Sequence, residues 1–161
     1  WINLMRTLPF LILAYLLYYG LPELGLRMSA WTAGLLALVI YHAAYFAEIL
    51  RGSILSVAQG QREACKALNL SRWTAFRKII LPQSLLVAIG PLGNELILMI
   101  KASAIASLVT IYDLMGVTKM VFSRSFDFQV YLWAAVLYLL IVEVVRRSLK
   151  LIESRLGRHL Q

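Results

Sequence analysis

Long runs of apolar residues, more than any catalytic motif, constrain what this chain can fold into. Three runs have the length of a membrane-crossing helix, namely residues 30–50, 79–100 and 128–145. About 20 helical residues cross a hydrocarbon core of about 30 Å. The chain is 61% hydrophobic with a mean hydropathy of +0.76, which is too apolar for an ordinary soluble domain. The sequence therefore predicts an all-α membrane protein.

A shorter apolar run, residues 8–21, precedes the other three. As a helix it covers roughly 21 Å, so it crosses a bilayer only if Arg6 and the Tyr18–Tyr19 pair lie at the two interfaces. With this run included, we expect four spans. Because the chain begins at Trp1 and not at Met, we also expect one further N-terminal span to be missing.

The net charge of +8 comes from basic residues that cluster along the chain. If four spans alternate in direction, 12 of the 16 basic residues fall on one side of the membrane. These are Arg6, Arg51, Arg62, Lys66, Arg72, Arg77, Lys78, Arg146, Arg147, Lys150, Arg155 and Arg158. An excess of Lys and Arg marks the cytoplasmic side, where anionic headgroups attract it further. The loop 51–78 and the basic tail 146–161 are therefore expected in the cytoplasm, and the charge does not indicate nucleic-acid binding.

Helix-breaking residues divide the segments around these spans. Gly52 and Ser53 are expected to end the second span, and the third span is expected to be bent or locally irregular because it carries prolines and glycines. These are Pro82, Gly90, Pro91 and Gly93. Residues 103–127 are mixed in polarity, with a mildly apolar part at 105–115. We expect a re-entrant or interfacial helix on the outer side there.

The loop between the second and third spans carries helix signals of its own. Residues 62–68 are good helix formers, and Asn69 tolerates the left-handed conformation that ends a helix. Ser71 is suited to cap a second short helix from Arg72, on which Trp73, Phe76 and Ile80 form an apolar stripe. The residues alone leave two readings open: a compact element that docks a protein partner, or an amphipathic loop lying on lipid headgroups.

The order of residues in loop 62–83 resembles the EAA loop of ABC-importer permeases. The likeness is carried by Glu63-Ala64-Cys65, Ala67-Leu68-Asn69-Leu70-Ser71 and Phe76-Arg77-Lys78-Ile79-Ile80-Leu81-Pro82-Gln83. Further segments are similar to the polar-amino-acid subfamily, among them Tyr18-Tyr19-Gly20-Leu21-Pro22, Ala43-Ala44-Tyr45-Phe46-Ala47-Glu48, Gln59-Gly60-Gln61 and Pro91-Leu92-Gly93-Asn94-Glu95. Three places depart from the family pattern: Cys65 replaces an Ala, Asn69 replaces a Gly, and Lys101-Ala102-Ser103-Ala104 lacks an acidic residue.

The resemblance implies the transmembrane domain of a type I ABC importer in a bacterial cytoplasmic (inner) membrane. It implies an identical or homologous second permease, two ATPase subunits, an extracytoplasmic solute-binding protein and an amino-acid-like substrate. ATP and Mg would be bound by the ATPase, so the chain would be a transport subunit and not an enzyme, with no cofactor or metal of its own. The residues implied to couple the permease to the ATPase are Glu63, Ala64, Cys65, Ala67, Asn69 and Ser71.

Polar residues inside the spans are the candidates for a substrate pathway. Glu95, beside Asn94, is the strongest, because an ionisable residue at membrane depth usually faces a partner or a wet cavity. It either contacts a substrate ammonium or pairs with Lys101 or Tyr138. His42 is expected to form an inter-helix hydrogen bond more readily than a proton relay. Tyr138 completes the candidate set.

Two other classes of function are compatible with the residues alone. One is an ion-coupled secondary carrier that uses Glu95 as its ion site. The other is a membrane anchor that does not transport and recruits a soluble partner through its basic loop. The carrier needs no partner ATPase, and the anchor predicts no solute flux through Asn94 and Glu95.

Overall fold

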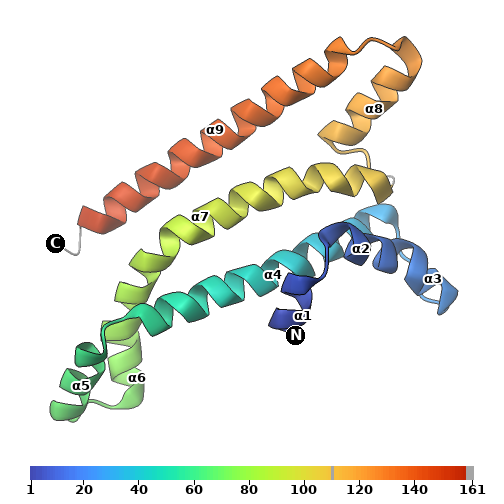
Figure 1. Ribbon diagram of the computed structural model, residues 1–161. Coiled ribbons are helices and arrows are strands. Elements are labelled where there is room, and N and C mark those ends of the chain that lie inside the picture. Colours follow the sequence, from blue (N-terminus) through green and yellow to red (C-terminus); the bar gives the residue numbers. More distant parts are fainter. Residues whose placement is uncertain (110, 159–161) are drawn as a thin grey trace.

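Three long helices dominate the computed structural model, which describes residues 1–109 and 111–158, with side chains as far as residue 155 (Figure 1). Within those ranges the helices long and apolar enough to cross a membrane are Ala30–Ser56, Arg72–Val109 and Gln129–Arg155. The first is α4 (Ala30–Ser56), and the last is part of α9 (Gln129–Arg158). The middle one joins α6 (Arg72–Ala75), a π-helical turn η2 (Phe76–Ile80), α7 (Leu81–Ala106) and a 3₁₀ turn η3 (Ser107–Val109).

Helix α7 lies between the other two long helices and packs against both α4 and α9. Small residues make the close approach of α4 possible: Ala33, Gly34, Ala37 and Ala44 are all buried. A Cβ at Gly34 would meet the Cδ1 of Ile111, in the segment that follows α7 and η3, so that side chain would have to shift. Small residues at such positions let two membrane helices approach closely enough for their backbones to pack.

The run expected to form the first span is a shorter apolar helix, Phe10–Glu23. It consists of α2 (Phe10–Tyr15), a π-helical turn η1 (Leu16–Gly20) and α3 (Leu21–Glu23), and α1 (Ile2–Thr7) precedes it. Both α1 and α2 pack against α4. At 1.5 Å per residue the Phe10–Glu23 helix is roughly 21 Å long, so a crossing by this segment stays a prediction.

The expected helix end at Gly52 and Ser53 is wrong, because α4 continues to Ser56. The Ser53 hydroxyl donates a hydrogen bond of 2.9 Å to the Ile49 carbonyl one turn earlier, and the side chain is buried. Ser and Gly in a helix interior cost only about 1 kcal/mol or less, which packing readily offsets.

The third span, expected to be bent or locally irregular, follows a curved course in α7 (Figure 1) and has a π-helical turn just before its first proline. Helix α7 is continuous through Pro91, whereas the π-helical turn η2 directly precedes α7. The Gln83 side-chain amide donates to the Ile79 carbonyl at 3.0 Å. Pro82 has no N–H, so the helix lacks one backbone hydrogen-bond donor at that residue. The Gln83 side chain supplies an additional donor one residue later.

The outer segment 103–127, where a re-entrant or interfacial helix is expected, contains the end of α7 at Ala106 and the helix α8 (Leu114–Ser125). Its position relative to the membrane stays a prediction. Asp113 fixes the start of α8, because the Gly116 amide donates to Asp113 Oδ1 at 2.8 Å. Phe126, with a φ of 53°, ends α8 in the left-handed conformation. Thr110 in the outer segment and residues 159–161 of the expected basic tail lie outside the described residues.

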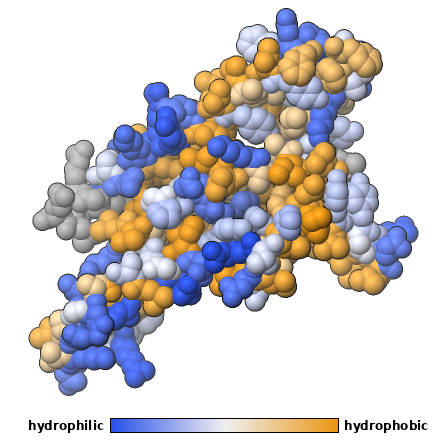
Figure 2. All heavy atoms as spheres, viewed as in Figure 1, coloured by the Kyte–Doolittle hydropathy of each residue, from blue (hydrophilic) through white to orange (hydrophobic). Residues whose placement is uncertain are grey.

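The buried core is small and lies where α2, α4 and the end of α7 meet. Its buried members are Phe10, Leu13, Ala14, Ala37, Ala106, Val109 and Ile111. Much of the remaining apolar surface is exposed, above all on α9. Only 6% of the most apolar 18-residue stretch of this helix is buried. Figure 2 shows hydrophobic side chains over much of this face and hydrophilic ones gathered over the α5–α6 end, with smaller hydrophilic groups between them. Such a surface fits contact with lipid or with another subunit.

Candidate functional sites

The loop between α4 and α7 folds into two short helices joined by a tight turn. Helix α5 (Gln59–Ala67) ends where the Asn69 amide donates to the Lys66 carbonyl at 2.9 Å and the Leu70 amide to the Cys65 carbonyl at 3.0 Å. This pair of bonds is the Schellman motif, which requires a left-handed residue between the two helices. Asn69 has a φ of 47°, so the expected left-handed turn at this position is confirmed.

Ser71 caps the second short helix, as the sequence predicted. Its hydroxyl accepts a hydrogen bond from the Thr74 amide at 3.2 Å, and α6 begins at Arg72. The apolar stripe formed by Trp73, Phe76 and Ile80 becomes more buried along its length. Trp73 is 67% exposed, whereas Ile80 is buried where the helix enters the apolar run. The stripe therefore turns from the loop surface into the membrane span.

Asn69 provides the first mutational prediction. Replacing Asn69 with Ala should destabilise the turn by about 1 kcal/mol, because a Cβ-bearing residue without a local hydrogen-bonding group strains the left-handed conformation. Replacing Asn69 with Gly should leave the turn intact or stabilise it slightly. Thermal unfolding of both variants in the purified transporter measures the difference. Equal unfolding temperatures for the two variants would contradict the prediction.

Helix α5 presents one polar face to its surroundings and another face to the interior of the loop. Glu63, Ala64 and Ala67 are exposed, and the Gln59 amide donates to Glu63 Oε1 at 2.8 Å. Cys65, expected to lie on a partner-facing surface, is instead only 3% exposed. With about 100° between successive helical residues, Cys65 lies on nearly the opposite side of α5 from Glu63. Its small size serves packing inside the loop.

A buried polar pair joins α4 to α7 in the middle of the apolar region. His42 Nδ1 and Glu95 Oε1 are 2.6 Å apart, and their side chains are 4% and 8% exposed. The rings of Tyr41, Tyr45 and Phe10 surround His42. The expected inter-helix hydrogen bond of His42 is therefore confirmed, and Glu95 pairs with neither Lys101 nor Tyr138. Within the described residues His42 Nε2 is buried without a hydrogen-bond partner.

The other two residues of the expected pathway lie apart from this pair. Asn94 is exposed on α7 and lines a groove against α9, together with Gly90, Arg146 and Glu153. Tyr138 projects from α9, and its hydroxyl donates to Asp113 Oδ2 at 3.4 Å. The structure therefore brings together only His42 and Glu95 among the four candidates.

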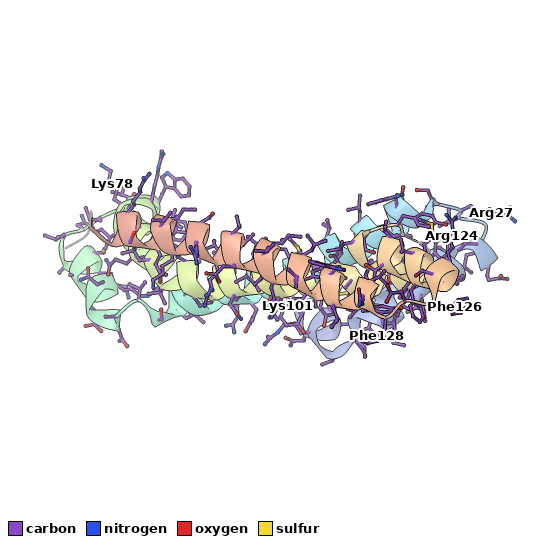
Figure 3. The ribbon with its side chains drawn as sticks, turned by 90° about the horizontal axis from the view of Figure 1, so that it is seen from above. Arg27, Lys78, Lys101, Arg124, Phe126 and Phe128 are labelled. Atoms are coloured by element: carbon purple, nitrogen blue, oxygen red, sulfur yellow. The ribbon has the colours of Figure 1, made fainter. Side chains whose placement is uncertain are left out.

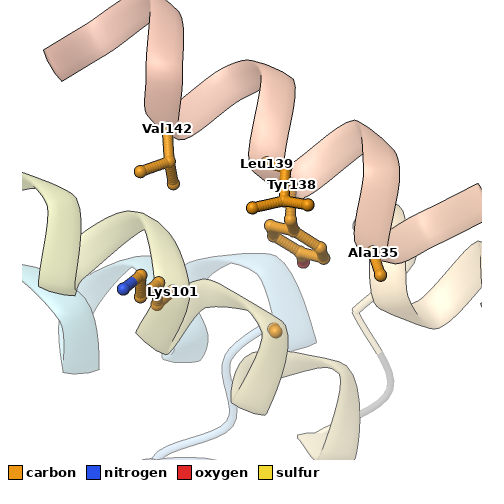
Figure 4. A pocket seen from close by; sticks show the side chains of 6 residues that line it. Lys101, Ala135, Tyr138, Leu139 and Val142 are labelled. Atoms are coloured by element: carbon orange, nitrogen blue, oxygen red, sulfur yellow. The ribbon is translucent and has the colours of Figure 1, made fainter. Parts of the chain in front are cut away.

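Tyr138 shares a cavity of about 410 Å³ with a residue that sequence reasoning did not select, Lys101 (Figure 4). The other lining residues are apolar or small: Ala104, Ala135, Leu139 and Val142. Lys101 is exposed, and among the described residues its ammonium forms no ion pair. Lys101 follows the apolar run 79–100 and lies within α7, which continues to Ala106.

Ion pairs occupy the helix ends that the sequence assigned to the cytoplasm. Glu48 accepts a hydrogen bond from Arg51 Nε at 2.8 Å and lies 3.4 Å from Arg6. Glu143 accepts from Arg146 Nε at 2.9 Å and from Arg147 Nε at 2.7 Å. In both cases the carboxylate and its arginine partners on the same helix lie about one helical turn apart. Viewed along the perpendicular direction, Lys78 lies at one end of the molecule and Arg27 and Arg124 at the other, with Lys101 between them (Figure 3).

The family model for binding-protein-dependent transport system inner membrane components matches residues 1–158. A probable amino-acid ABC transporter permease protein, YckA of Bacillus subtilis, is 38% identical over 160 residues, covering 99% of this chain and 71% of the relative. A probable glutamine ABC transporter permease protein, GlnM of the same organism, is 36% identical and covers 98% of this chain and 74% of the relative.

A solved structure gives the same result for the fold. It is the crystal structure of an amino acid ABC transporter with histidines, 36% identical, with a TM-score of 0.90. The match covers 96% of this chain and 72% of that chain. The all-helical architecture is therefore that of an ABC importer transmembrane domain, in which nucleotide binding belongs to a separate ATPase subunit. These likenesses, together with the geometry of the loop, show that the chain belongs to the family of binding-protein-dependent transport system inner membrane components, the permease subunits of ABC importers.

Proposed function

We propose that this chain moves a polar amino acid or an amino-acid derivative across a bacterial cytoplasmic membrane. A solute-binding protein delivers the substrate, two ATPase subunits supply the energy, and a second permease, identical or homologous, completes the pathway. The observation that carries this proposal is the 38% identity to a probable amino-acid permease over 160 residues of this chain. In the proposed topology, residues 8–21, 30–50, 79–100 and 128–145 cross the membrane, and residues 51–78 and the tail from 146 are cytoplasmic.

The exposed face of α5 is the proposed contact with the ATPase. Glu63 supplies a carboxylate, while Ala64 and Ala67 leave room for the partner to approach the helix closely. The turn at Asn69 and the cap at Ser71 hold the two short helices at a fixed angle. Cys65 supports this surface from behind, because it is buried inside the loop.

Movement of the loop would reach the membrane through the two helices that it connects. The chain enters the loop from α4 and leaves it through α6 and η2 into α7. The His42–Glu95 bond ties α4 to α7 near mid-membrane. A displacement of α5 would therefore move α4 and α7 as one body, which is the kind of rocking that alternating access uses.

The cavity between α7 and α9 is the proposed place of substrate passage. Lys101 follows directly on the proposed span 79–100, and its ammonium forms no ion pair within the described residues. An amino acid brings a carboxylate with which this ammonium would pair. Tyr138 lies in the same cavity, and Asn94 lines the neighbouring groove between the same helices. Glu95, being held by His42, serves here as a structural group.

Uptake by the reconstituted complex tests the function. Proteoliposomes containing the permease pair and its ATPase, supplied with the binding protein, should accumulate a labelled amino acid only when ATP is present. Uptake driven by a proton or sodium gradient without the ATPase would instead identify a secondary carrier. Complete absence of flux with an assembled, ATP-hydrolysing complex would favour the anchor.

Replacing Lys101 with Met should reduce this uptake at least about tenfold, because loss of one charge-assisted hydrogen bond costs about 1.5–3 kcal/mol. The matched control is Arg124→Met, which removes an exposed cation from the end of α8 and should leave uptake unchanged. Wild-type uptake by the Lys101 variant would remove this residue from the pathway.

A further inference from the structure

A second cavity lies inside the loop, between α5 and the α6–η2 segment. It has a volume of about 410 Å³. Three cationic side chains and three apolar ones define its chemistry: Arg62, Lys66, Arg72, Leu70, Phe76 and Ile80. The cavity thus combines three positively charged side chains with an apolar wall.

The positive charge of this cavity is not neutralised by the described part of the chain. Lys66 and Arg72 form no ion pair or side-chain hydrogen bond there. Arg62 donates from Nη2 to the Ile54 carbonyl at 2.6 Å, a bond to a neutral group that fixes the guanidinium in place. Glu63 is the only acidic residue in loop 51–78, and its carboxylate is bonded to Gln59 on the exposed side of α5.

The apolar wall leads directly into the membrane span. Ile80 is buried at the start of the apolar run, and Phe76 precedes it by about 6 Å of helix. Arg72 lies about 12 Å before Ile80 on the same axis. Headgroups occupy roughly 5–8 Å beyond the hydrocarbon core on each side, and an arginine reaches several ångströms along its own stem. The cations therefore lie within reach of lipid phosphate when Ile80 lies at the edge of the core.

We propose that this cavity binds the headgroup of an anionic phospholipid, with the phosphate near Lys66 and Arg72 and the upper acyl chain on Phe76 and Ile80. The inference rests on the proposed function in one respect, the cytoplasmic position of the loop. An acidic segment of the ATPase is the less favoured occupant, because Arg62 and Cys65 in the cavity wall lie about 100° and about 160° around α5 from Glu63, the residue proposed to face that subunit. Lys66 lies only about 60° from Glu63, so the test includes loss of the ATPase among its outcomes. Basic pockets at the cytoplasmic ends of membrane helices have the chemistry that anionic headgroups require.

The test uses the complete transporter, permease and ATPase together, in nanodiscs of phosphatidylcholine with increasing phosphatidylglycerol. Bound phosphatidylglycerol is measured by native mass spectrometry, and ATP hydrolysis and uptake are measured in parallel preparations. The variant is Lys66→Gln with Arg72→Gln. Its matched control is Arg77→Gln with Lys78→Gln, which removes the same charge from the same loop outside the cavity.

The cavity variant should bind phosphatidylglycerol about thirtyfold more weakly, because each cation near an anionic surface strengthens binding about fivefold. The control should retain most of its binding, and inorganic phosphate in millimolar excess should not compete. Equal losses in the two variants would overturn the proposal, since loop charge alone would then explain binding. Loss of the ATPase from the cavity variant with unchanged lipid binding would overturn it in favour of a protein occupant. ATP-driven uptake by the wild-type complex is judged separately, so failure of lipid binding does not imply failure of the transport function.

Discussion

The variant Glu63→Lys should leave the permease folded but abolish the coupling between ATP hydrolysis and uptake. Glu63 is exposed on α5, and its bond to Gln59 one turn earlier is a surface contact, so the fold does not depend on it. Loop 51–78 carries six basic residues and this one acid. A lysine here would therefore replace the only carboxylate that the loop can offer to a basic group on the ATPase.

The expected loss at this contact is about 2–5 kcal/mol, the usual cost of removing one partner of a hydrogen-bonded charge pair at an interface. Uptake and binding-protein-stimulated ATP hydrolysis, measured on the same preparation, report the loss. Glu23→Lys is the matched control, because it makes the same charge change at an exposed acid at the end of α3. Wild-type uptake by the Glu63 variant would show that this carboxylate does not contact the ATPase.

The second large effect concerns the buried pair between α4 and α7. Glu95→Ala should destabilise the permease by about 3–5 kcal/mol, because it leaves His42 buried without its partner. Asn94→Ala, at the neighbouring exposed position, should change stability by about 0.5 kcal/mol or less. Thermal unfolding in a fixed lipid mixture measures both.

A double replacement separates the structural role of this pair from a role in substrate binding. His42→Leu with Glu95→Leu replaces a buried polar pair with apolar side chains, which is often neutral or stabilising. The doubly substituted permease should therefore recover the stability lost in Glu95→Ala and should still transport. A well-folded double variant that imports nothing would instead show that Glu95 or His42 touches the substrate.

Local features of the loop could be read from the sequence because short-range chemistry determines them. Asn69 tolerates the left-handed conformation and Ser71 caps a helix, and both effects depend on residues fewer than six positions away. The ion pairs of Glu48 with Arg51 and of Glu143 with Arg147 follow equally from the spacing of one helical turn.

Contacts between helices could not be read in the same way. His42 and Glu95 are 53 residues apart, and nothing local specifies that these two side chains face each other. Asn94 and Glu95 are neighbours in sequence, yet about 100° of helical rotation puts one in a groove against α9 and the other against α4. Gly52 and Ser53 were misread for a related reason, since burial of Ser53 offset a weak local preference.

The central claim is that the exposed face of α5 contacts the ATPase during transport. A photo-reactive amino acid at position 64 of an assembled, actively importing complex tests it most directly, with the same probe at Arg27 as the control. Illumination should join position 64 to the ATPase subunit in the nucleotide-free and ATP-bound states, and should join position 27 to it in neither. An importing complex in which position 64 never forms an adduct with the ATPase would contradict the claim.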